Sequence, residues 1–386
     1  MRNVGIIAEY NPFHQGHLYQ INKLRELGAE TITVCMSGNF VQRSVPAILE
    51  KHERAATAVM SGVDLVIELP VRYSIASARD FSFGGVYLLD KTGFVDTLCF
   101  GSETDDIALI TSSFSYFDKA EKEGIIKKYL NTGVSFAKAR DMALLELKSP
   151  FVPRNPNDIL AFEYLLAIRK LKSKICPFSV RRLGNYHDDN TVLSATGIRK
   201  KIENGTISES DLPPASFSSL SRALENGEIP SHEKFEVATL AFLKREAFYG
   251  NIDCRGFYAL SEGLGNRILK YSLFSSSLLE LYEKAKTKRY AMSAVRRGVV
   301  SILFGIEKKL SLPSYFHILA FNSKGRALLK KLKETTLPIY HSLPAKDGKF
   351  FTNDMRSDVF ADDLYSLCLA SPGRSGMSFT EKSVIV

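Results

Sequence analysis

The sequence predicts an α/β fold, with a parallel sheet in the first half of the chain and a mostly α-helical part after it. Four short apolar segments, rich in β-branched residues, alternate with helix-length segments between residues 3 and 103. Strands separated in this way are typical of parallel sheets with right-handed crossovers. Beyond residue 205 the apolar residues recur mainly at helical spacing.

The first half contains strand and helix candidates in alternation. Strands are predicted over residues 3–10, 31–38, 64–71 and 95–103, and residues 178–186 form a candidate fifth strand. Helices are predicted over residues 17–27, 49–62 and 81–93, and Gly28 and Gly62 can end the first two. A further helix over residues 194–205 has Ser194 in the N-cap position.

The second half begins after a segment rich in turn-forming residues. Residues 204–220, which include Pro213 and Pro214, indicate a linker or a domain edge. Helices are predicted over residues 232–248, 262–286, 292–306 and 316–334, and the tail 371–386 is expected to be loosely held. We therefore divide the chain into an α/β domain, residues 1–205, and a mainly helical, basic domain, residues 206–386.

Composition indicates an ordinary folded protein, with 45% hydrophobic and 24% charged residues among 386. No stretch approaches the roughly 20 apolar residues of a membrane span, and the N-terminal apolar run is too short for a signal peptide. The five cysteines are dispersed, which is expected of reduced thiols buried in a cytoplasmic protein, and their spacing indicates no zinc site. We expect no metal ligands and no membrane partner. The sequence does not indicate which oligomeric state the protein has.

The net charge of +9 is unevenly distributed, with +6 from residue 206 onward and +3 before it. A basic surplus attracts polyanions but says nothing about the fold. Many proteins with such a surplus bind no nucleic acid, so charge alone does not identify the partner.

Two histidines flank a glycine where the first strand leads into the first helix, in His14-Gln15-Gly16-His17. Ligands of open parallel sheets bind beyond the carboxyl ends of the strands, and a helix N-terminus attracts phosphate. Gly16 would let a phosphate approach the backbone, and two imidazoles could stabilise charge that develops on it. Alternatively, both histidines cap the helix or pack locally.

A second candidate phosphate site is the segment from Ser194 to Arg199, again at a predicted helix start. The hydroxyls of Ser194 and Thr196 can hold phosphate oxygens, and Arg199 can place a forked cation on the β- and γ-phosphates. The alternative is a capped helix with an arginine on its surface.

The pair of motifs, HxGH early and SxTxIR late, resembles the nucleotidylyltransferase superfamily. The segments GIIAEYNPFHQGHLYQ, MSGNFVQR, GVDLVIELP, FGSE, PNDILAFEYL, RRLGNYHD and SEGLGNRILK occur in the order typical of the tRNA(Met) cytidine acetate ligase family. This resemblance covers nearly the whole chain and implies a Rossmann-like nucleotidyltransferase sheet. It also implies that acetate is activated with ATP to acetyl-adenylate, and that the acetyl group then passes to N4 of the wobble cytidine of elongator tRNA(Met).

The resemblance also implies a set of site residues. The implied catalytic residues are His14, His17 and Arg199. The implied ATP-binding residues are Ile7, Ala8, Glu9, Tyr10, Asn11, Pro12, Phe13, His14, Gln15, Gly16, His17, Leu18, Tyr19, Gln20, Gly101, Asn157, Arg182, Ser194 and Thr196. From the residues alone, Gly101 could be a turn glycine, Asn157 an N-cap and Arg182 a solvated charge.

The loop of residues 36–43 follows the second strand, and we expect it to border acetate or the cytidine, unless it is a plain connection. The chain departs from the family pattern at Ser44-Val45, at Arg79-Asp80 and at Asp158. These departures concern details of the acetate and tRNA contacts. Mg²⁺ is expected to accompany the triphosphate of ATP.

Basic residues of the second half are candidates for contacts with tRNA, since cations bind backbone phosphates and aromatics stack on unpaired bases. The candidates are Lys286, Lys288, Arg289, Arg296, Arg297, Lys330 and Lys331. The alternative is a solvated charged face. A different enzyme, a small-coenzyme adenylyltransferase of the same superfamily, is the second functional hypothesis.

Overall fold

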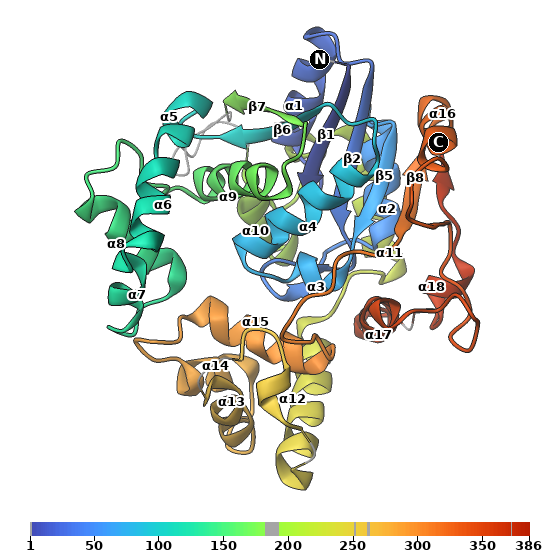
Figure 1. Ribbon diagram of the computed structural model, residues 1–386. Helices are drawn as coiled ribbons and strands as arrows, with labels where there is room; N and C mark the ends of the chain where they lie inside the picture. Colours follow the sequence, from blue (N-terminus) through green and yellow to red (C-terminus); the bar gives the residue numbers. More distant parts are fainter. Residues whose placement is uncertain (1, 182–192, 251, 261–262, 372) are drawn as a thin grey trace. The chain divides into compact units, whose positions relative to one another are not determined.

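The structure, a computed structural model, describes residues 2–181, 193–250, 252–260, 263–371 and 373–386. Contacts divide the chain into two compact units (Figure 1). Unit 1 comprises Met1–Gly101, Ala167–Phe235 and Ser311–Val386, and unit 2 comprises Ser102–Leu166 and Glu236–Leu310. The expected division at residue 205 follows the order of the chain, whereas the contacts group both ends of the chain together and place an internal segment of the first half in unit 2.

Unit 1 contains the strands, apart from the last residue of β6. They are β1 (Asn3–Ala8), β2 (Thr31–Ser37), β3 (Phe40–Val41), β4 (Val45–Pro46), β5 (Leu65–Leu69), β6 (Thr97–Ser102), β7 (Cys176–Arg181), β8 (Phe316–Phe321), β9 (Ile339–Tyr340) and β10 (Val384–Ile385). The main sheet has the order β10-β8-β5-β2-β1-β6-β7, and β9 pairs with β8. The short strands β3 and β4 form an antiparallel hairpin.

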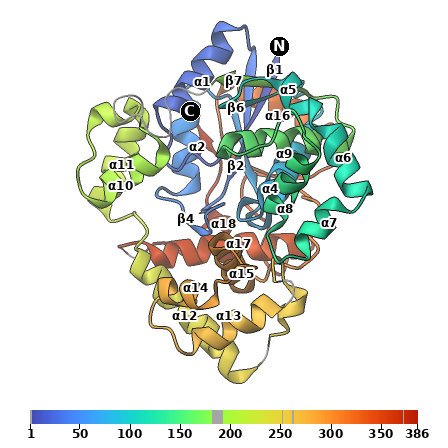
Figure 2. The ribbon, with the colours of Figure 1, turned by 90° about the vertical axis from the view of Figure 1, so that its left-hand side faces the viewer.

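Helices cover both faces of this sheet. On one face Val4 and Ile6 of β1 pack in a core with residues of α1 (Gln15–Glu26) and α2 (Lys51–Met60). On the other face the backbone of Gly5 and the side chain of Ile7 approach α4 (Ala78–Lys91). Figure 2 shows the sheet nearly edge-on, with α1 and α2 on one side and α4 on the other. The first half therefore has the predicted layered α/β arrangement.

The remaining helices of unit 1 come from the middle and the end of the chain. They are α3 (Val71–Ser74), α10 (Ala195–Glu203), the 3-10 turn η1 (Glu209–Asp211), α11 (Pro214–Asn226), α16 (Ser323–Leu332), α17 (Asn353–Cys368) and α18 (Met377–Thr380). Residues 204–220 were expected to be a linker or a domain edge, and they contain η1 and the start of α11. Pro214 lies at the first position of α11, where its missing N–H costs no hydrogen bond.

Unit 2 is built from helices. They are α5 (Ile107–Ser112), α6 (Phe114–Lys122), α7 (Ile125–Leu130), α8 (Phe136–Glu146), most of α9 (Pro156–Leu171), most of α12 (His232–Tyr249), the 3-10 turn η2 (Cys254–Gly256), α13 (Leu264–Ser272), α14 (Leu278–Ala285) and α15 (Met292–Leu303). Arg140 of α8 is buried and donates to Glu163 of α9 at 2.7 Å, with its guanidinium over the ring of Phe162. Among the described residues, no helix is both long and apolar enough to cross a membrane.

The prediction of a helix over residues 316–334 is wrong for its first part. Residues 316–321 form β8, which pairs antiparallel with β5 and parallel with β10, so the sheet is mixed rather than wholly parallel. All six residues of β8 are buried, and a continuous apolar run has no alternation that would distinguish a strand from a helix. Asn322 then caps α16 by accepting from the N–H of Gly325 at 3.0 Å.

Two smaller expectations also fail. Residues 373–386 of the tail are held in place, because β10 joins the sheet and the hydroxyl of Ser378 donates to Asp362 at 2.5 Å.

Cysteine burial was expected throughout, but Cys176 is exposed at the start of β7. The other four cysteines are buried, and none of the five forms a disulfide.

Gly325 tests how closely α16 packs on the sheet. A Cβ atom at this position would lie 2.0 Å from the backbone oxygen of Asp64 and 2.8 Å from Phe321 Cβ. Because backbone atoms cannot rotate away, we expect Gly325→Ala to lower the free energy of unfolding by at least about 2 kcal/mol, as overpacking does. Urea unfolding measures this change. Gly256→Ala, where a Cβ meets nothing within 4 Å, is the matched control; equal stability of the two variants would contradict this packing.

Candidate active site

The loop between β1 and α1 is held in place by a buried arginine. Arg54 of α2 is fully buried and donates to three backbone oxygens: Glu9 at 2.5 Å, Gly38 at 2.5 Å and Leu49 at 2.9 Å. These oxygens come from three loops, and one guanidinium fork therefore fixes their mutual positions.

Two further hydrogen bonds fix the same loop. The side-chain oxygen of Asn11 accepts from the N–H of Ile48 at 2.8 Å, and the hydroxyl of Ser216 in α11 donates to the carbonyl of Phe13 at 2.7 Å. Asn11 and Phe13 are both buried. The segment before the first histidine is therefore a rigid part of unit 1.

His14 and His17 form a reciprocal cap at the start of α1. The Nδ1 atom of His14 accepts from the N–H of Gly16 at 3.1 Å, and the Nδ1 atom of His17 accepts from the N–H of His14 at 3.2 Å. Their rings stack with centroids 3.7 Å apart. Because Nδ1 is an acceptor in both rings, each neutral imidazole carries its proton on Nε2. The cap thus sets the tautomer of both histidines.

Gly16 lies close to the ring of His14. A Cβ atom here would lie 3.0 Å from Cε1 and 3.2 Å from Nδ1 of His14. A larger residue would therefore require the His14 ring to shift by a few tenths of an ångström. The structure therefore gives Gly16 a role in addition to the close phosphate approach that we expected.

The helix α10 brings the second motif to this loop. Arg199 donates to the carbonyl of Asn11 at 2.8 Å and to the hydroxyl of Thr196 at 3.1 Å. Ser194 is the N-cap and accepts from the N–H of Gly197 at 3.3 Å. Arg43 also donates to Thr196, at 3.2 Å. Two motifs about 180 residues apart thus meet at one edge of the sheet, where a helix N-terminus attracts anions.

The loop after β2 is attached to the same edge. The carboxylate of Glu9 accepts from the N–H of Gln42 at 2.7 Å. Burial of this carboxyl raises its pKa. The hydrogen bond from Gln42 and the charges of Arg199, Arg54 and Arg43 oppose this shift. Glu9, one of the implied ATP-binding residues, therefore holds the hairpin of β3 and β4.

Comparisons with known proteins show the family of the chain. The family model described as HIGH Nucleotidyl Transferase matches residues 1–377. The tRNA(Met) cytidine acetate ligases of Clostridium novyi and Clostridium kluyveri are 36% and 38% identical over 390 and 396 residues, with 95% of each chain covered. The chain belongs to the tRNA(Met) cytidine acetate ligase family.

A solved structure of the same family has the same fold. The chain is similar to Thermotoga maritima TmcAL bound with alpha-thio ATP, with a TM-score of 0.88 and 29% identity over 100% of this chain and 99% of that one. The nucleotidyltransferase fold that the resemblance implied for this ligase family member is therefore confirmed.

The other predicted nucleotide-site residues lie in several settings. Tyr10 and Phe13 belong to the hydrophobic core, and Leu18 and Tyr19 pack against it. The amide of Gln20 donates to Cys99 Sγ at 3.3 Å. In this ligase family member these side chains hold the loop and the helix in place. Ile7, Ala8, Glu9, Pro12 and Gln15 lie along the same segment.

The contacts of this cluster do not test the remaining predictions, Gly101, Asn157 and Arg182. Gly101 lies in β6 near the carboxyl end of that strand. Asn157 belongs to unit 2, near the start of α9, and donates to Glu103 at 2.6 Å. Arg182 lies outside the described residues. These positions stay predictions for the nucleotide site.

Asp158, one departure from the family pattern, has a clear local role. Its carboxylate accepts from the hydroxyls of Ser102 at 2.7 Å and Thr104 at 2.8 Å, and from the N–H groups of Glu103 and Thr104. Burial favours the neutral acid, but these hydrogen bonds outweigh it and lower the pKa of Asp158. The carboxylate therefore fixes the turn that follows β6.

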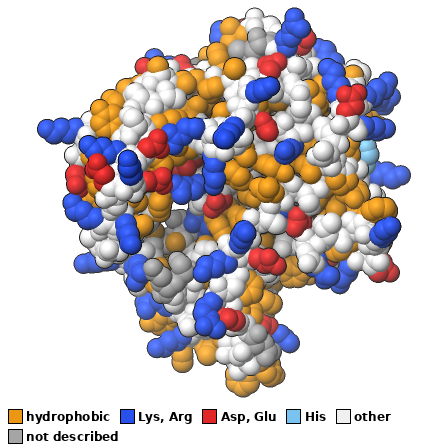
Figure 3. Space-filling view, viewed as in Figure 1, with side chains coloured by type: hydrophobic (Ala, Val, Ile, Leu, Met, Phe, Trp, Pro, Cys, Tyr) orange, Lys and Arg blue, Asp and Glu red, His pale blue; other side chains and the backbone are white. Residues whose placement is uncertain are grey.

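The basic residues that we predicted for tRNA belong to both units. Lys286, Lys288 and Arg289 are exposed between α14 and α15 in unit 2, and Arg296 lies over the ring of Tyr282. Lys330 and Lys331 are exposed on α16, which belongs to unit 1. Figure 3 shows Lys and Arg side chains spread over the visible face. Charge alone therefore does not single out one RNA surface on this ligase family member.

The sequence analysis did not predict a buried ionic cluster that includes Asn39, in the loop after β2. We call it the Lys51 cluster. Lys51 donates to both carboxylate oxygens of Glu68 at 3.0 Å and to Asp362 of α17 at 2.5 Å. His317 of β8 contacts Glu68, and the Asn39 amide donates to Asp362 at 2.9 Å. All five residues are buried. Its signal in the sequence is Glu68, a charged residue inside an apolar strand.

The charges of this cluster compensate one another. Burial alone would lower the pKa of Lys51, but Asp362 and Glu68 outweigh it and hold that pKa above its usual value. Burial would likewise raise the pKa of Glu68, but Lys51 and His317 keep it low. For His317 burial dominates and lowers the pKa, so the ring is neutral and its Nδ1–H donates to Glu68.

Asp358, one turn before Asp362, gives a stability test of this packing. It accepts from the N–H of Val71 at 2.6 Å and from the hydroxyl of Tyr315 at 2.5 Å. Burial, together with the charge of Glu68, raises the pKa of Asp358 from its usual 3.8 to about 6, despite the nearby Arg72. Between these two values the folded protein binds a proton that the unfolded chain releases, so stability falls as the pH rises.

We expect Asp358→Asn to remove this loss. Relative to the variant, the wild-type free energy of unfolding should decline between about pH 4 and about pH 6 and then stay constant. Urea unfolding of both proteins over that range measures the difference. Asp347→Asn, at an exposed position, is the control. A difference between wild type and Asp358→Asn that does not change with pH would contradict the assignment.

Proposed function

We propose that the protein is an ATP-dependent ligase that acetylates N4 of the wobble cytidine of elongator tRNA(Met). Acetate and ATP would form acetyl-adenylate and pyrophosphate, and the acetyl group would then pass to the tRNA with release of AMP. The observation that carries the proposal is the hydrogen bond from Arg199 to Asn11, in the loop that leads into the stacked His14–His17 pair at the carboxyl edge of the sheet. The names of the relatives and the ATP analogue named with the Thermotoga structure support it.

In the first step a carboxylate oxygen of acetate attacks the α-phosphorus of ATP, and the bond to the β-phosphate bridging oxygen breaks. Negative charge increases on the phosphate oxygens during this exchange. The Nε2–H groups of His14 and His17 are donors suited to that charge, since the capping bonds already hold both rings in one tautomer. Arg199 adds a forked cation on the phosphates.

In the second step the amine at N4 of cytidine attacks the acetyl carbon, AMP leaves with the electrons of the anhydride bond, and N4 releases one proton to solvent. The amine is a weak nucleophile, because its lone pair is delocalised into the ring. Holding it about 3–3.5 Å from the carbonyl carbon supplies much of the rate enhancement. We assign the loop of residues 38–43 to the border of this acyl site, since Glu9 and Arg54 attach it beside the histidines.

Mg²⁺ belongs to the proposal as a companion of the triphosphate, whose charge it would offset. In the described part of the chain, no group of three or more His, Cys, Asp or Glu side chains could hold a metal ion. Because the substrate is a tRNA, the proposal places the reaction in the cytoplasm.

The decisive experiment combines purified protein, ATP, Mg²⁺, labelled acetate and bulk tRNA. Nucleoside digestion and mass spectrometry should then find the label in N4-acetylcytidine, and only when ATP is present. A small-coenzyme adenylyltransferase, the alternative, would retain AMP in its product and would not respond to tRNA. Pyrophosphate release without a labelled nucleoside would overturn the proposed acceptor.

His17 offers a test that separates catalysis from capping. His17→Asn keeps an acceptor near the Nδ1 position and loses the Nε2–H donor, whereas His17→Gln places its amide near Nε2. We expect His17→Asn to reduce acetyl-adenylate formation by about 100-fold or more, as loss of one oxyanion donor does, and His17→Gln to retain more activity. Acetate-dependent exchange of pyrophosphate into ATP measures both variants.

The control for this pair is His232→Asn, at a histidine whose side chain is 74% exposed. It should behave as the wild type. The affinity of His17→Asn for tRNA should also stay close to that of the wild type, since the donor acts on the phosphate of ATP. Equal activity of the Asn and wild-type proteins would contradict a catalytic role for His17.

A further inference from the structure

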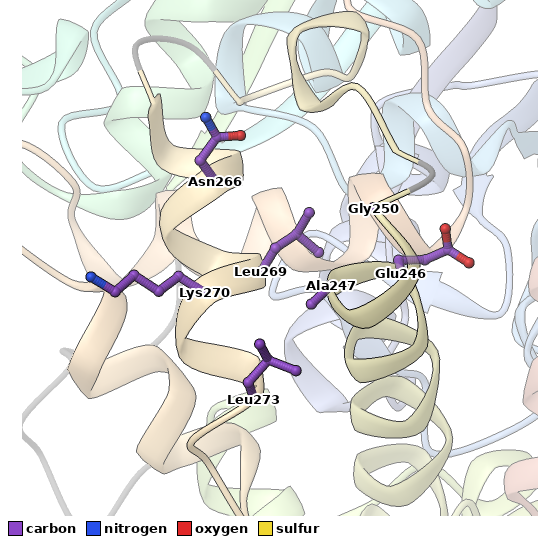
Figure 4. A pocket seen from close by; sticks show the side chains of 7 residues that line it. All are labelled: Glu246, Ala247, Gly250, Asn266, Leu269, Lys270 and Leu273. Carbon is purple, nitrogen blue, oxygen red and sulfur yellow. The ribbon is translucent and has the colours of Figure 1, made fainter.

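Unit 2 carries a cavity of about 190 Å³ between the end of α12 and α13. It is lined by Glu246, Ala247, Gly250, Asn266, Leu269, Lys270 and Leu273. Figure 4 shows Leu269 and Leu273 directed from α13 toward α12, with Lys270 on the outer side of α13. The cavity therefore has an apolar floor with a cation nearby, and Asn266 offers both a donor and an acceptor.

Aromatic side chains next to this cavity are unusually exposed. Phe248 and Tyr249 follow the lining residue Ala247 and are 77% and 65% exposed, and Phe274 follows Leu273 and is 67% exposed. Their rings contribute little to the core of unit 2. Large exposed aromatic surfaces rimmed by polar groups are typical of binding sites. We call the cavity and these three rings the α12–α13 surface.

The segment of unit 2 that contains this surface carries a net positive charge, which favours a polyanion. Residues 236–310 contain 13 Lys and Arg and 7 Asp and Glu. Arg245 lies over the ring of Tyr249, and Arg267 and Lys270 lie over the ring of Tyr271. Glu246, the one acidic lining residue, is buried and paired with Arg245. A phosphate could therefore approach Lys270 while a base lies against the exposed rings.

We propose that the α12–α13 surface binds an unpaired nucleotide of the RNA substrate. The base would stack on Phe248 or Tyr249, which is a sequence-tolerant interaction, and its phosphate would lie near Lys270. This inference rests on the proposed function, which supplies a substrate with unpaired loop nucleotides. This surface differs from the basic residues predicted for tRNA in the sequence analysis. Its rings would contact bases, whereas the basic residues would contact phosphates.

A second copy of the chain is the competing occupant, because exposed apolar side chains also form dimer contacts. Two copies meeting here would bring two positively charged surfaces together, which costs free energy. RNA neutralises that charge and releases counterions. The charge therefore favours RNA, and the oligomeric state is an outcome of the test.

The chain contains no tryptophan, which makes a direct probe available. Tyr249→Trp introduces a single indole on the proposed stacking ring. We expect its fluorescence to be quenched when tRNA or a single-stranded oligonucleotide is added, and much less by a blunt RNA duplex, whose bases are already stacked. Phe350→Trp, at a position that is 66% exposed in unit 1, is the matched control and should show no such quenching.

Affinity provides the second readout. Tyr249→Ala combined with Phe248→Ala should weaken binding of labelled tRNA by about tenfold, in keeping with the loss of a stacked base. Phe350→Ala should bind as the wild type. Circular dichroism and thermal unfolding check that the exposed substitutions leave the fold intact.

The outcomes separate the two proposals. If the wild type acetylates tRNA but Tyr249→Trp is not quenched under conditions where labelled tRNA is bound, this surface is not a nucleotide site. If light scattering shows a dimer that Phe248→Ala and Tyr249→Ala dissociate, the surface binds a second copy, and the inference is overturned. Failure of tRNA acetylation by the wild type would instead refute the proposed function.

Discussion

Burial of the Lys51 ammonium is the constraint on which unit 1 depends. A buried cation must be paired, and removal of one partner would leave an uncompensated charge. One carboxylate partner comes from β5 and the other from α17, near the C-terminus. The ion pair can therefore form only when the last part of the chain has joined the sheet of the first part. We infer that β8, α17 and β10 are integral to the nucleotidyltransferase fold.

Hydrogen bonds connect the Lys51 cluster with the loops of the candidate active site. The Asn39 side chain accepts from the N–H of Lys51 at 2.8 Å and donates to Asp362 at 2.9 Å. Arg54, one turn later in α2, holds the carbonyls of Gly38 and Glu9. The start of α2 thus connects the buried charges with the loops that carry the histidines. A catalytic group must be held within a fraction of an ångström, and such supporting contacts provide that rigidity.

The sequence alone predicted the strands of the first half and the place of the HxGH motif, since alternating β-branched runs and a helix start are local signals. It could not predict β8, because six buried residues show no alternation, nor the partners of Lys51, which are 17 and 311 positions away. The family resemblance implied that Asn11 and Arg199 belong to one nucleotide site, but their hydrogen bond was not predicted. Arg54 was missed because one charged residue in an amphipathic helix is normally solvated.

The alternative roles considered for the histidines, capping and catalysis, are compatible. Each Nδ1 accepts a backbone N–H, and this contact places the proton of the neutral ring on Nε2. A histidine without that contact would exchange tautomers and rotate, and its donor would have to be oriented during the reaction. The cap removes this reorganisation before substrate binds, which is the condition under which a hydrogen-bond donor contributes most to catalysis. The function that we propose therefore uses the helix start of α1 as a preorganised donor pair because it is also a structural cap.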